Sequence, residues 1–296
     1  MTHRRAVVLM VLVTLMWSIA GVVTRHLESA RSFEVTFWRS AFNALALVLL
    51  LAWLRGPRVL ARSIATGGRA LWISAACWGV MFTAFMVAIT LTTVANVLVT
   101  MAIAPLFTAL LARFVLKQQL PVRTWVAIVA AGIGIAWMYA SEVRGADTRH
   151  LLGTLVALGV PVAAAINWTT IQALRGRDAP PDLLPAVLIG ALLSAAITLP
   201  LAWPFAASGH DLALLALLGT VQLAIPCLLV VVIARVLPAP ELALLALLEV
   251  IFGVAWAWLG AGEAPGAAVL AGGSLVLAAL FANEALALAS GRPPRS

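Results

Sequence analysis

The chain has 296 residues, of which 64% are hydrophobic and only 10% are charged. A soluble domain carries about 25% charged residues, so a chain of this composition cannot cover its surface for water. Its formal net charge of +8 would raise nucleic acid as a partner of a soluble protein, but the basic residues lie mainly in short segments between long apolar stretches. Composition therefore excludes a soluble nucleic-acid-binding domain and indicates a polytopic α-helical membrane protein.

Ten apolar stretches follow one another along the chain. A helix needs about 20 apolar residues to cross the roughly 30 Å of hydrocarbon in a bilayer. The predicted spans are residues 6–24, 33–54, 70–91, 94–116, 121–141, 151–174, 183–205, 211–236, 239–261 and 265–288. No charge separates the third stretch from the fourth, and we expect the turn between them within residues 90–95. The first stretch lacks a small-residue cleavage pattern, so we interpret it as a retained span and not a signal peptide.

The basic residues predict the orientation of these spans. With the N-terminus inside, most of the 19 Lys and Arg residues fall in inner segments, whereas the outer segments hold Arg25, Arg31, Arg144 and Arg149. The inner set lies in residues 4–5, 55–69, 113–123, 175–177, 235 and 292–295. This bias follows the positive-inside rule and predicts a multi-pass protein with both termini in the cytoplasm.

The end of the fourth stretch resembles the end of the ninth. One reads Ala-Pro-Leu-Phe over residues 104–107 and then Lys117-Gln118, and the other reads Glu-Val-Ile-Phe over residues 249–252 and then Gly262-Glu263. The equal spacing predicts one five-helix unit used twice, as repeats 1–141 and 151–290, with a connecting loop at 142–150 and a tail at 291–296. Because five is odd, the second copy enters the membrane inverted, an arrangement that secondary transporters use. The predicted fold class is an all-α polytopic membrane protein of ten transmembrane helices, built as two inverted five-helix repeats around a central cavity.

Polar and aromatic side chains within the spans predict what lines that cavity. A polar group at membrane depth usually faces the bundle interior or a water-filled space. The candidate substrate-binding residues are Trp17, Ser18, Asn43, Trp78, Phe82, Asn96, Thr100, Asn167, Trp168, Gln222, Glu249 and Trp256. Each aromatic residue taken alone is more often a packing residue, but together the set has the composition of a small-molecule site.

Two charged residues within the spans leave alternatives open. Glu249 lies near the middle of the ninth span. Its carboxyl group could have a structural role, bind a substrate ammonium, or change protonation during transport. Arg39 shares a face of the second span with Thr36, Ser40 and Asn43. It suits a residue that snorkels to the outer interface or fixes the helix, or one that binds a substrate carboxylate.

Helix-breaking and small residues suggest which spans move and which are rigid. Pro105 and Pro226 interrupt their spans and are candidate hinge or gating residues, as a proline frees a backbone carbonyl and permits a kink. Pro161 and Pro200 also fall within spans. The fifth and tenth spans contain Gly132, Gly134, Gly272 and Gly273, which allow close helix contact and predict a scaffold pair.

Several kinds of chemistry have no sequence signature here. The histidines lie in tails or loops, a phosphate-binding Gly-x-x-x-x-Gly-Lys-Ser/Thr run is absent, and the spans hold no catalytic Ser/His/Asp or Cys/His set. Cys77 and Cys227 fall within spans and are interpreted as small packing residues. We therefore expect no metal, no cofactor and no enzymatic activity, although an intramembrane enzyme acting on lipid-linked substrates stays an alternative.

The order of motifs resembles the drug/metabolite transporter superfamily, and within it the EamA-type ten-helix exporters. The matching residues are Trp17-Ser18, Phe37-Trp38-Arg39, Ala95, Pro105, Phe107, Gly153, Trp168, Leu248-Glu249, Phe252-Gly253 and Gly262-Glu263. The resemblance covers nearly the whole chain. It departs at Gln118, where the family usually has glutamate, and at Val250, where it usually has proline.

Within that family, the Trp- and Phe-rich third span is similar to that of the bacterial aromatic amino acid exporters (the YddG-like group). The resemblance implies export of aromatic and other neutral amino acids and related metabolites by alternating access. It also implies a bacterial inner-membrane location, amino acids and the lipid bilayer as partners, and a monomer sufficient for function. A multidrug or other metabolite carrier of the same fold is the alternative.

Overall fold

The computed structural model of the chain describes residues 2–115, 117, 119, 121–144, 148–174, 181–233, 236 and 245–289, and every regular element in these ranges is helical. Gln118, residues 237–238 between the predicted eighth and ninth spans, and the predicted tail at 291–296 lie outside the described residues. The elements are α1 (His3–Thr24), α2 (Ser32–Arg55), α3 (Pro57–Thr66), α4 (Gly68–Leu91), α5 (Val94–Ala102), α6 (Ala104–Val115), α7 (Val122–Arg144), α8 (Thr148–Ala157), α9 (Gly159–Ala173), α10 (Leu184–Ala202), α11 (Gly209–Leu217), the π-helix η1 (Leu218–Ala224), α12 (Ile225–Ile233), α14 (Leu248–Ala261) and α15 (Ala267–Ala289).

Seven helical stretches in these ranges are long and apolar enough to cross a membrane. They are His3–Thr24, Ser32–Arg55, Gly68–Leu91, Val94–Val115, Thr148–Ile171, Leu184–Ala202 and Gly209–Val230. Three shorter apolar helices accompany them, at Val122–Gly134, Leu248–Ala261 and Ala267–Asn283. The protein is therefore a multi-pass membrane protein, and these helices fall within the predicted spans to within a few residues.

One connection lies where the sequence predicted it, and a second one has different bounds. The turn expected within residues 90–95 lies at Thr92 and Thr93, where the Thr93 side chain caps α5 by accepting a hydrogen bond from the Asn96 backbone N–H. The predicted loop at 142–150 is shorter in its described part, because α7 continues to Arg144 and α8 begins at Thr148.

Three spans are broken close to a proline. α5 and α6 are separated at Ile103 and α8 and α9 at Leu158, two or three residues before Pro105 and Pro161. The π-helix η1 ends directly before Ile225 and Pro226. A proline inside a helix lacks an N–H donor and clashes with the carbonyl four residues earlier, which accounts for the interruptions. Pro200, in contrast, lies within the continuous helix α10.

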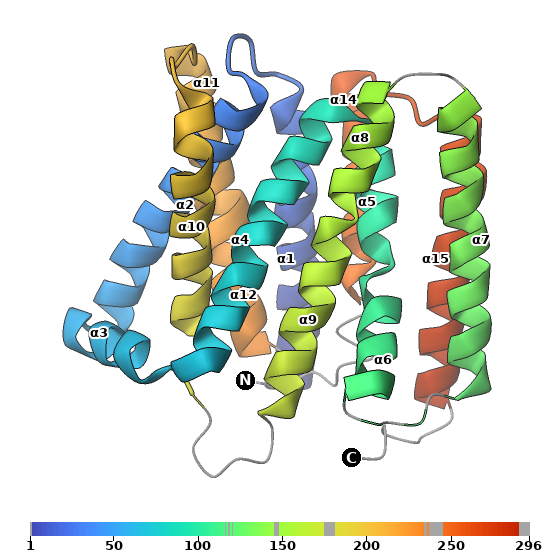
Figure 1. The fold of residues 1–296 in the computed structure, drawn as a ribbon, viewed down its shortest axis with the longest axis horizontal. Coiled ribbons are helices and arrows are strands. Elements are labelled where there is room, and N and C mark those ends of the chain that lie inside the picture. The colour runs from blue at the N-terminus through green and yellow to red at the C-terminus, as the bar shows by residue number, and fades with distance from the viewer. Residues whose placement is uncertain are drawn as a thin grey trace.

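The helices stand side by side with their ends at two opposite faces of the bundle (Figure 1). α1 begins and α15 ends at the lower end in this view, and α3 lies beside α2 at the same end. α3 is a short helix that was not predicted; it carries Arg58 and Arg62 with apolar Leu60 and Ile64. We refer below to the upper and lower ends of the bundle as drawn in Figure 1.

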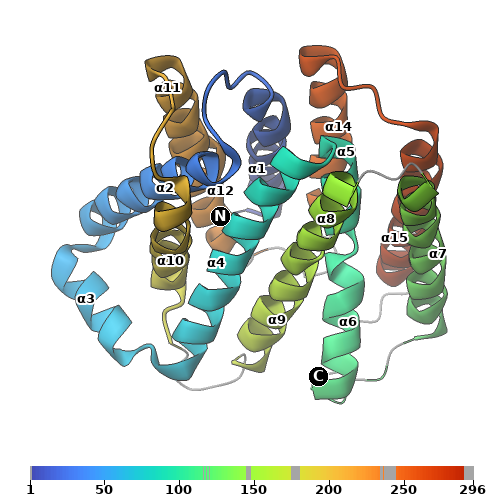
Figure 2. The same ribbon diagram turned by 45° about the horizontal axis from the view of Figure 1, so that its top comes forward.

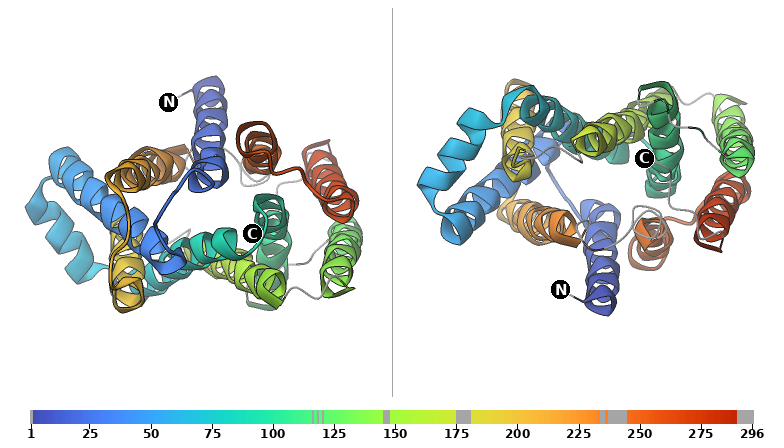
Figure 3. Two further views of the ribbon diagram at one scale, coloured as in Figure 1. Left: turned by 90° about the horizontal axis from the view of Figure 1, so that it is seen from above. Right: turned by 90° about the horizontal axis from the view of Figure 1, so that it is seen from below.

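α7 and α15 pair with each other at one edge of the molecule, which Figures 2 and 3 show from further directions. A Cβ atom at Gly134 would lie 2.6 Å from the Gly272 carbonyl oxygen, so the two backbones approach closely. A Cβ atom at Gly273 would lie 3.0 Å from a side-chain methyl of Val99 in α5, whereas no described atom of another element lies within 4 Å of the Cβ position of Gly132. The predicted close contact between these two spans is therefore found at Gly134 and Gly272.

α4 packs between α10 on one side and α8 and α9 on the other (Figure 3). The contact with α10 is possible because Gly190 has no side chain, as a Cβ there would lie 2.9 Å from the Ala75 carbonyl oxygen and 2.9 Å from the Gly79 nitrogen. This packing brings the aromatic residues of α4 into the core.

Candidate functional site

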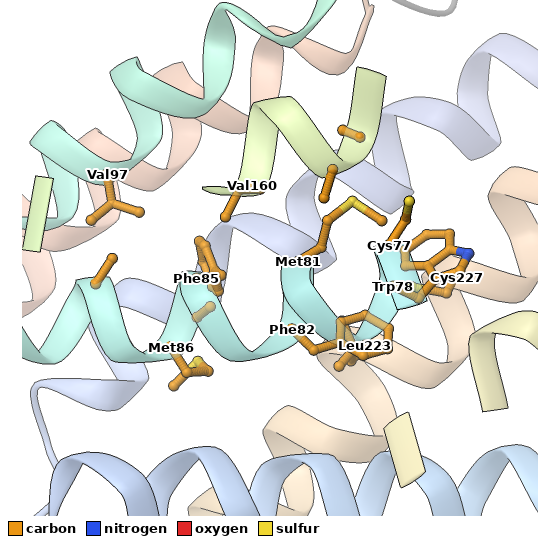
Figure 4. Packing of buried hydrophobic residues seen from close by; sticks show 14 of the residues in the cluster. Cys77, Trp78, Met81, Phe82, Phe85, Met86, Val97, Val160, Leu223 and Cys227 are labelled. Carbon is orange, nitrogen blue, oxygen red and sulfur yellow. The ribbon is translucent and has the colours of Figure 1, made fainter. Parts of the chain in front are cut away.

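One face of α4 carries a stripe of buried aromatic side chains. Trp78, Phe82 and Phe85 follow one another at helical spacing and are all buried. The Trp78 and Phe82 rings are 5.4 Å apart, and Trp78 meets Trp168 of α9 edge to face at 6.3 Å. Figure 4 shows the stripe together with Leu223 of η1 and Cys227 of α12. The structure therefore brings together the predicted residues Trp78, Phe82 and Trp168.

Arg39 of α2 lies at one end of this stripe and is almost completely buried, with 1% of its surface exposed. Its guanidinium donates to Gln222 Oε1 through Nε at 3.3 Å and Nη2 at 2.9 Å. The guanidinium carbon also lies 5.5 Å from the centre of the Phe85 ring, within the range of a cation–π interaction. The interpretation of Arg39 as a snorkelling residue is therefore wrong, because the side chain packs inside the bundle among α4 and η1.

Gln222 links three spans. Its oxygen accepts from Arg39, and its Nε2 donates to the Trp17 backbone oxygen at 3.1 Å. It lies in the π-helix η1, which packs closely on α2: a Cβ atom at Gly219 would lie 2.7 Å from the Arg39 carbonyl oxygen and 2.8 Å from the Asn43 nitrogen. A π-turn inside a transmembrane helix is frequently found at a functional site.

Several buried polar side chains have atoms without a hydrogen-bond partner in the described part of the chain. They include Trp38 Nε1, Arg39 Nη1, both amide atoms of Asn43, Asn96 Oδ1, Thr100 Oγ1, Asn167 Nδ2 and Thr169 Oγ1. Leaving such a group unpaired costs about 1–3 kcal/mol, so native proteins rarely keep them without a reason. Four of these residues, Asn43, Asn96, Thr100 and Asn167, are predicted site residues.

These amides are oriented by neighbouring hydroxyl groups. Ser74 of α4 donates to Asn167 Oδ1 at 2.6 Å, and Asn167 Nδ2 has no partner among the described residues. On α5, Asn96 donates through Nδ2 to Thr92 Oγ1 at 3.2 Å, and its oxygen is left free. Thr100 lies one turn further along the same face.

Glu249 lies in the first turn of α14, directly after a helix interruption at Leu247. Its side chain is half-buried and, among the described residues, makes no hydrogen bond or ion pair. It interacts electrostatically with Arg39 and with Cys227. The carboxylate therefore belongs to the same part of the bundle as Arg39.

The other predicted residues have different surroundings. Ser18 is buried, donates to the Leu15 carbonyl oxygen at 2.8 Å, and lies where α1 meets α14 at Gly253. Pro105 is half-buried at the start of α6, and Pro226 is buried at the start of α12. Trp256 is 41% exposed, so the structure does not bring it into the group of buried site residues.

The upper end of the bundle holds a polar network that the sequence did not assign. Arg25 pairs with Glu263 at 2.6 Å and donates to the carbonyl oxygens of Ile89 and Thr92, both at 2.9 Å. Glu263 also accepts from the Val94 backbone N–H at 2.6 Å. These contacts join α1, the α4–α5 turn and the α14–α15 loop, and we call them the upper latch.

Two buried carboxylates hold the neighbouring loops. Asp211 accepts from the backbone N–H groups of Glu28, Ser29 and Ala30 at 2.8–2.9 Å. Reciprocally, Glu34 of α2 accepts from residues 206 and 207 in the loop before α11 at 2.8–3.0 Å. A cavity of about 330 Å³ lies beside this region and is lined by Thr24, Arg25, Leu27, Ala30, Arg31, Ser32, Val35, Thr90 and Arg149. A capping box at Ser208 and Asp211 was the only sequence signal for this arrangement.

Comparison with known proteins supports the fold over nearly the whole chain and the family resemblance over its first 140 residues. A solved crystal structure, described only as that of a protein, aligns with 98% of this chain and 100% of its own at a TM-score of 0.64 and 16% sequence identity. A search of curated proteins gave no match. Residues 4–140, which carry the Arg39 and α4 side of the site, match the EamA-like transporter family.

Proposed function

We propose that this protein is a membrane transporter of the drug/metabolite type that moves a small amphiphilic molecule through the centre of the bundle by alternating access. The observation that carries this proposal is the set of buried, unpartnered polar atoms on α2, α5 and α9, next to the aromatic stripe of α4. Such a combination of apolar walls and a few convergent polar groups suits a small-molecule site.

We further propose ten membrane spans in two inverted five-helix halves, comprising residues 1–141 and 151–290. The shorter apolar helices in α7, α14 and α15 supply the three spans beyond the seven long ones. The halves share a local feature, because the fourth span is interrupted at Ile103 and the ninth at Leu247, close to equivalent positions in the doubled motif. The first bond after each interruption is also alike: Leu106 donates to Ile103, and Val250 donates to Leu247.

The charge distribution supports an orientation. Arg4, Arg5, Arg58 and Arg62 lie toward the lower end of the bundle, where α1 begins. By the positive-inside rule, the lower end faces the cytoplasm and the upper latch faces outward. We propose the bacterial inner membrane as the location, on the basis of the family resemblance.

Amino acids, aromatic and other neutral ones, are the proposed substrates, and export is the proposed direction. The Trp78–Trp168 pair offers apolar and aromatic contact, and Asn167 and Asn43 offer hydrogen bonds to a zwitterionic group. A multidrug carrier of the same fold is the second candidate, and a counterflow panel of amino acids, purines and cationic drugs in proteoliposomes distinguishes the two.

Removing the proposed contacts is expected to reduce transport. Trp78→Ala, Trp168→Ala and Glu249→Gln should each lower amino acid counterflow by about tenfold or more, because aromatic and charged anchors dominate binding energy. The measurement is initial counterflow rate in proteoliposomes at equal protein incorporation. Trp53→Ala is the matched control, since Trp53 is 81% exposed, and it should transport like the wild type. Wild-type rates in all three site variants would overturn the proposed site.

Alternating access also requires the upper end to open, so the upper latch should control access there. Glu263→Gln removes the partner of Arg25 and is expected to raise the maleimide labelling rate of a Thr24→Cys probe by about threefold or more, through a shift toward the open state. Thr24 is suitable because it is buried and lines the upper cavity. The protein without the Thr24 probe reports background labelling of the buried Cys77 and Cys227. Equal labelling rates with and without Glu263→Gln would show that the latch does not hold this end closed.

A further inference from the structure

Arg39 presents a permanent charge in the interior of the bundle without an anion bonded to it. An arginine side chain keeps its proton in proteins, so it cannot become neutral when it is buried. Its one hydrogen-bonding partner among the described residues is the neutral amide oxygen of Gln222, which accepts from both Nε and Nη2. A buried charge in an apolar surrounding usually requires an opposite charge as well as hydrogen bonds.

The guanidinium is held so that its terminal nitrogen Nη1 stays free to donate. Gln222 accepts from Nε and Nη2, and the Phe85 ring lies 5.5 Å from the guanidinium carbon. In the part of the chain that the structure describes, Nη1 has no hydrogen-bond partner. Gln222 is itself fixed by its bond to the Trp17 backbone oxygen. The free Nη1 is thus a preorganised donor, and the whole side chain is 1% exposed.

Glu249 is the carboxylate of this part of the bundle, but it does not bind the Nη1 donor of Arg39. Glu249 interacts electrostatically with Arg39, but these two described residues form no ion pair. An anion on Arg39 would leave Glu249 available for a positive group on the same molecule. The amides of Asn43, one turn along α2 from Arg39, add donors and an acceptor on the same face.

We propose that Arg39 is the binding group for the carboxylate of the transported molecule, and that Gln222 positions it. This inference rests on the proposed transport function and narrows its substrate class: the cargo carries a carboxylate together with an apolar or aromatic part that contacts the α4 stripe. Amines and neutral aromatic molecules of the same size lack the group that Arg39 binds. The principal contact is a charge-assisted hydrogen bond, which is stronger than a neutral one.

Direct binding to purified protein tests this inference. The probes are phenylalanine, 3-phenylpropionate, phenylalaninamide and 2-phenylethylamine, which share a ring and differ in their charged groups, and binding is measured by calorimetry in detergent. Wild-type protein is expected to bind the two carboxylates at least about tenfold more tightly than the two probes without one. Arg39→Gln should remove this preference and change the affinity for 2-phenylethylamine by less than about threefold.

Two further variants keep the test decisive if Arg39→Gln is unstable. Gln222→Glu places a carboxylate on Arg39 from inside the protein, so the variant should stay folded and lose the preference for carboxylates. Arg58→Gln removes the same charge from an exposed position on α3 and should bind like the wild type. A carboxylate preference that survives in Arg39→Gln, or in Gln222→Glu where Arg39→Gln does not fold, would overturn the inference. If wild-type protein binds these carboxylates but moves no amino acid in proteoliposomes, the proposed transport function fails while the role of Arg39 stands.

Discussion

Replacing Asp211 by alanine is expected to lower the free energy of unfolding by about 3 kcal/mol or more, because several buried backbone donors lose their acceptor at once. The carboxylate is fully buried and accepts from Glu28, Ser29 and Ala30, and from Ser208 at 3.3 Å. Among the described residues these N–H groups donate to no other acceptor, so they would be left unpaired in the folded state. The measurement is the midpoint of thermal unfolding in detergent, which should fall by several degrees.

Asp182→Ala is the matched control for this experiment. Asp182 forms an ion pair with Arg55, but both side chains are partly exposed, at 27% and 34%. An exposed ion pair contributes about 1 kcal/mol or less. If Asp182→Ala destabilises the protein as much as Asp211→Ala, burial and backbone hydrogen bonding do not account for the role of Asp211.

Replacing Gly219 by alanine is expected to lower transport by at least about tenfold and the free energy of unfolding by about 2 kcal/mol. The added Cβ would lie 2.6 Å from Phe42 Cβ and 2.7 Å from the Arg39 carbonyl oxygen. Backbone atoms cannot move aside as a flexible side chain can, so η1 has to shift away from α2. That shift separates Gln222 from Arg39, and counterflow rate and unfolding midpoint should both report it.

Gly132→Ala provides a control with the opposite expected effect on the free energy of unfolding. Gly132 lies inside α7, and no described side chain or neighbouring helix comes within 4 Å of its Cβ position. Alanine in a helix interior is favoured over glycine by about 0.5–1 kcal/mol, so this variant should be slightly more stable and transport normally. Equal losses in both variants would mean that helix propensity, and not the contact with α2, explains the result.

The membrane spans could be predicted from the sequence because hydropathy is a local property of the chain. The bounds of α1, α2 and α4 follow the apolar runs, and the turn between α4 and α5 lies within the expected residues 90–95. The buried amides at Asn43, Asn96 and Asn167 were also predictable, since a polar side chain at membrane depth faces the interior.

What could not be predicted depends on partners that are distant in sequence. The bond between Arg39 and Gln222 joins α2 to η1, and no pattern near Arg39 distinguishes a buried guanidinium from a snorkelling one. The role of Asp211 likewise depends on a loop formed by residues 28–30. Trp256 shows the converse: it shares helical spacing with Glu249, but α14 exposes that tryptophan at its surface. Spacing along one helix therefore indicates a face and not what lies against it.

The π-helix η1 also determines in which directions the side chains of its span point. Asp211 and Gln222 are about three α-helical turns apart, so a continuous α-helix would place both side chains on nearly the same side. A π-turn holds more residues than an α-turn, so η1, which contains Gln222, points its side chains in other directions than a continuous α-helix would. The part of the span before η1 can face the α1–α2 loop through Asp211, while η1 directs Gln222 at Arg39 and Trp17. The wider winding of η1 thus lets a single span anchor a loop at one end and position the Arg39 guanidinium further along.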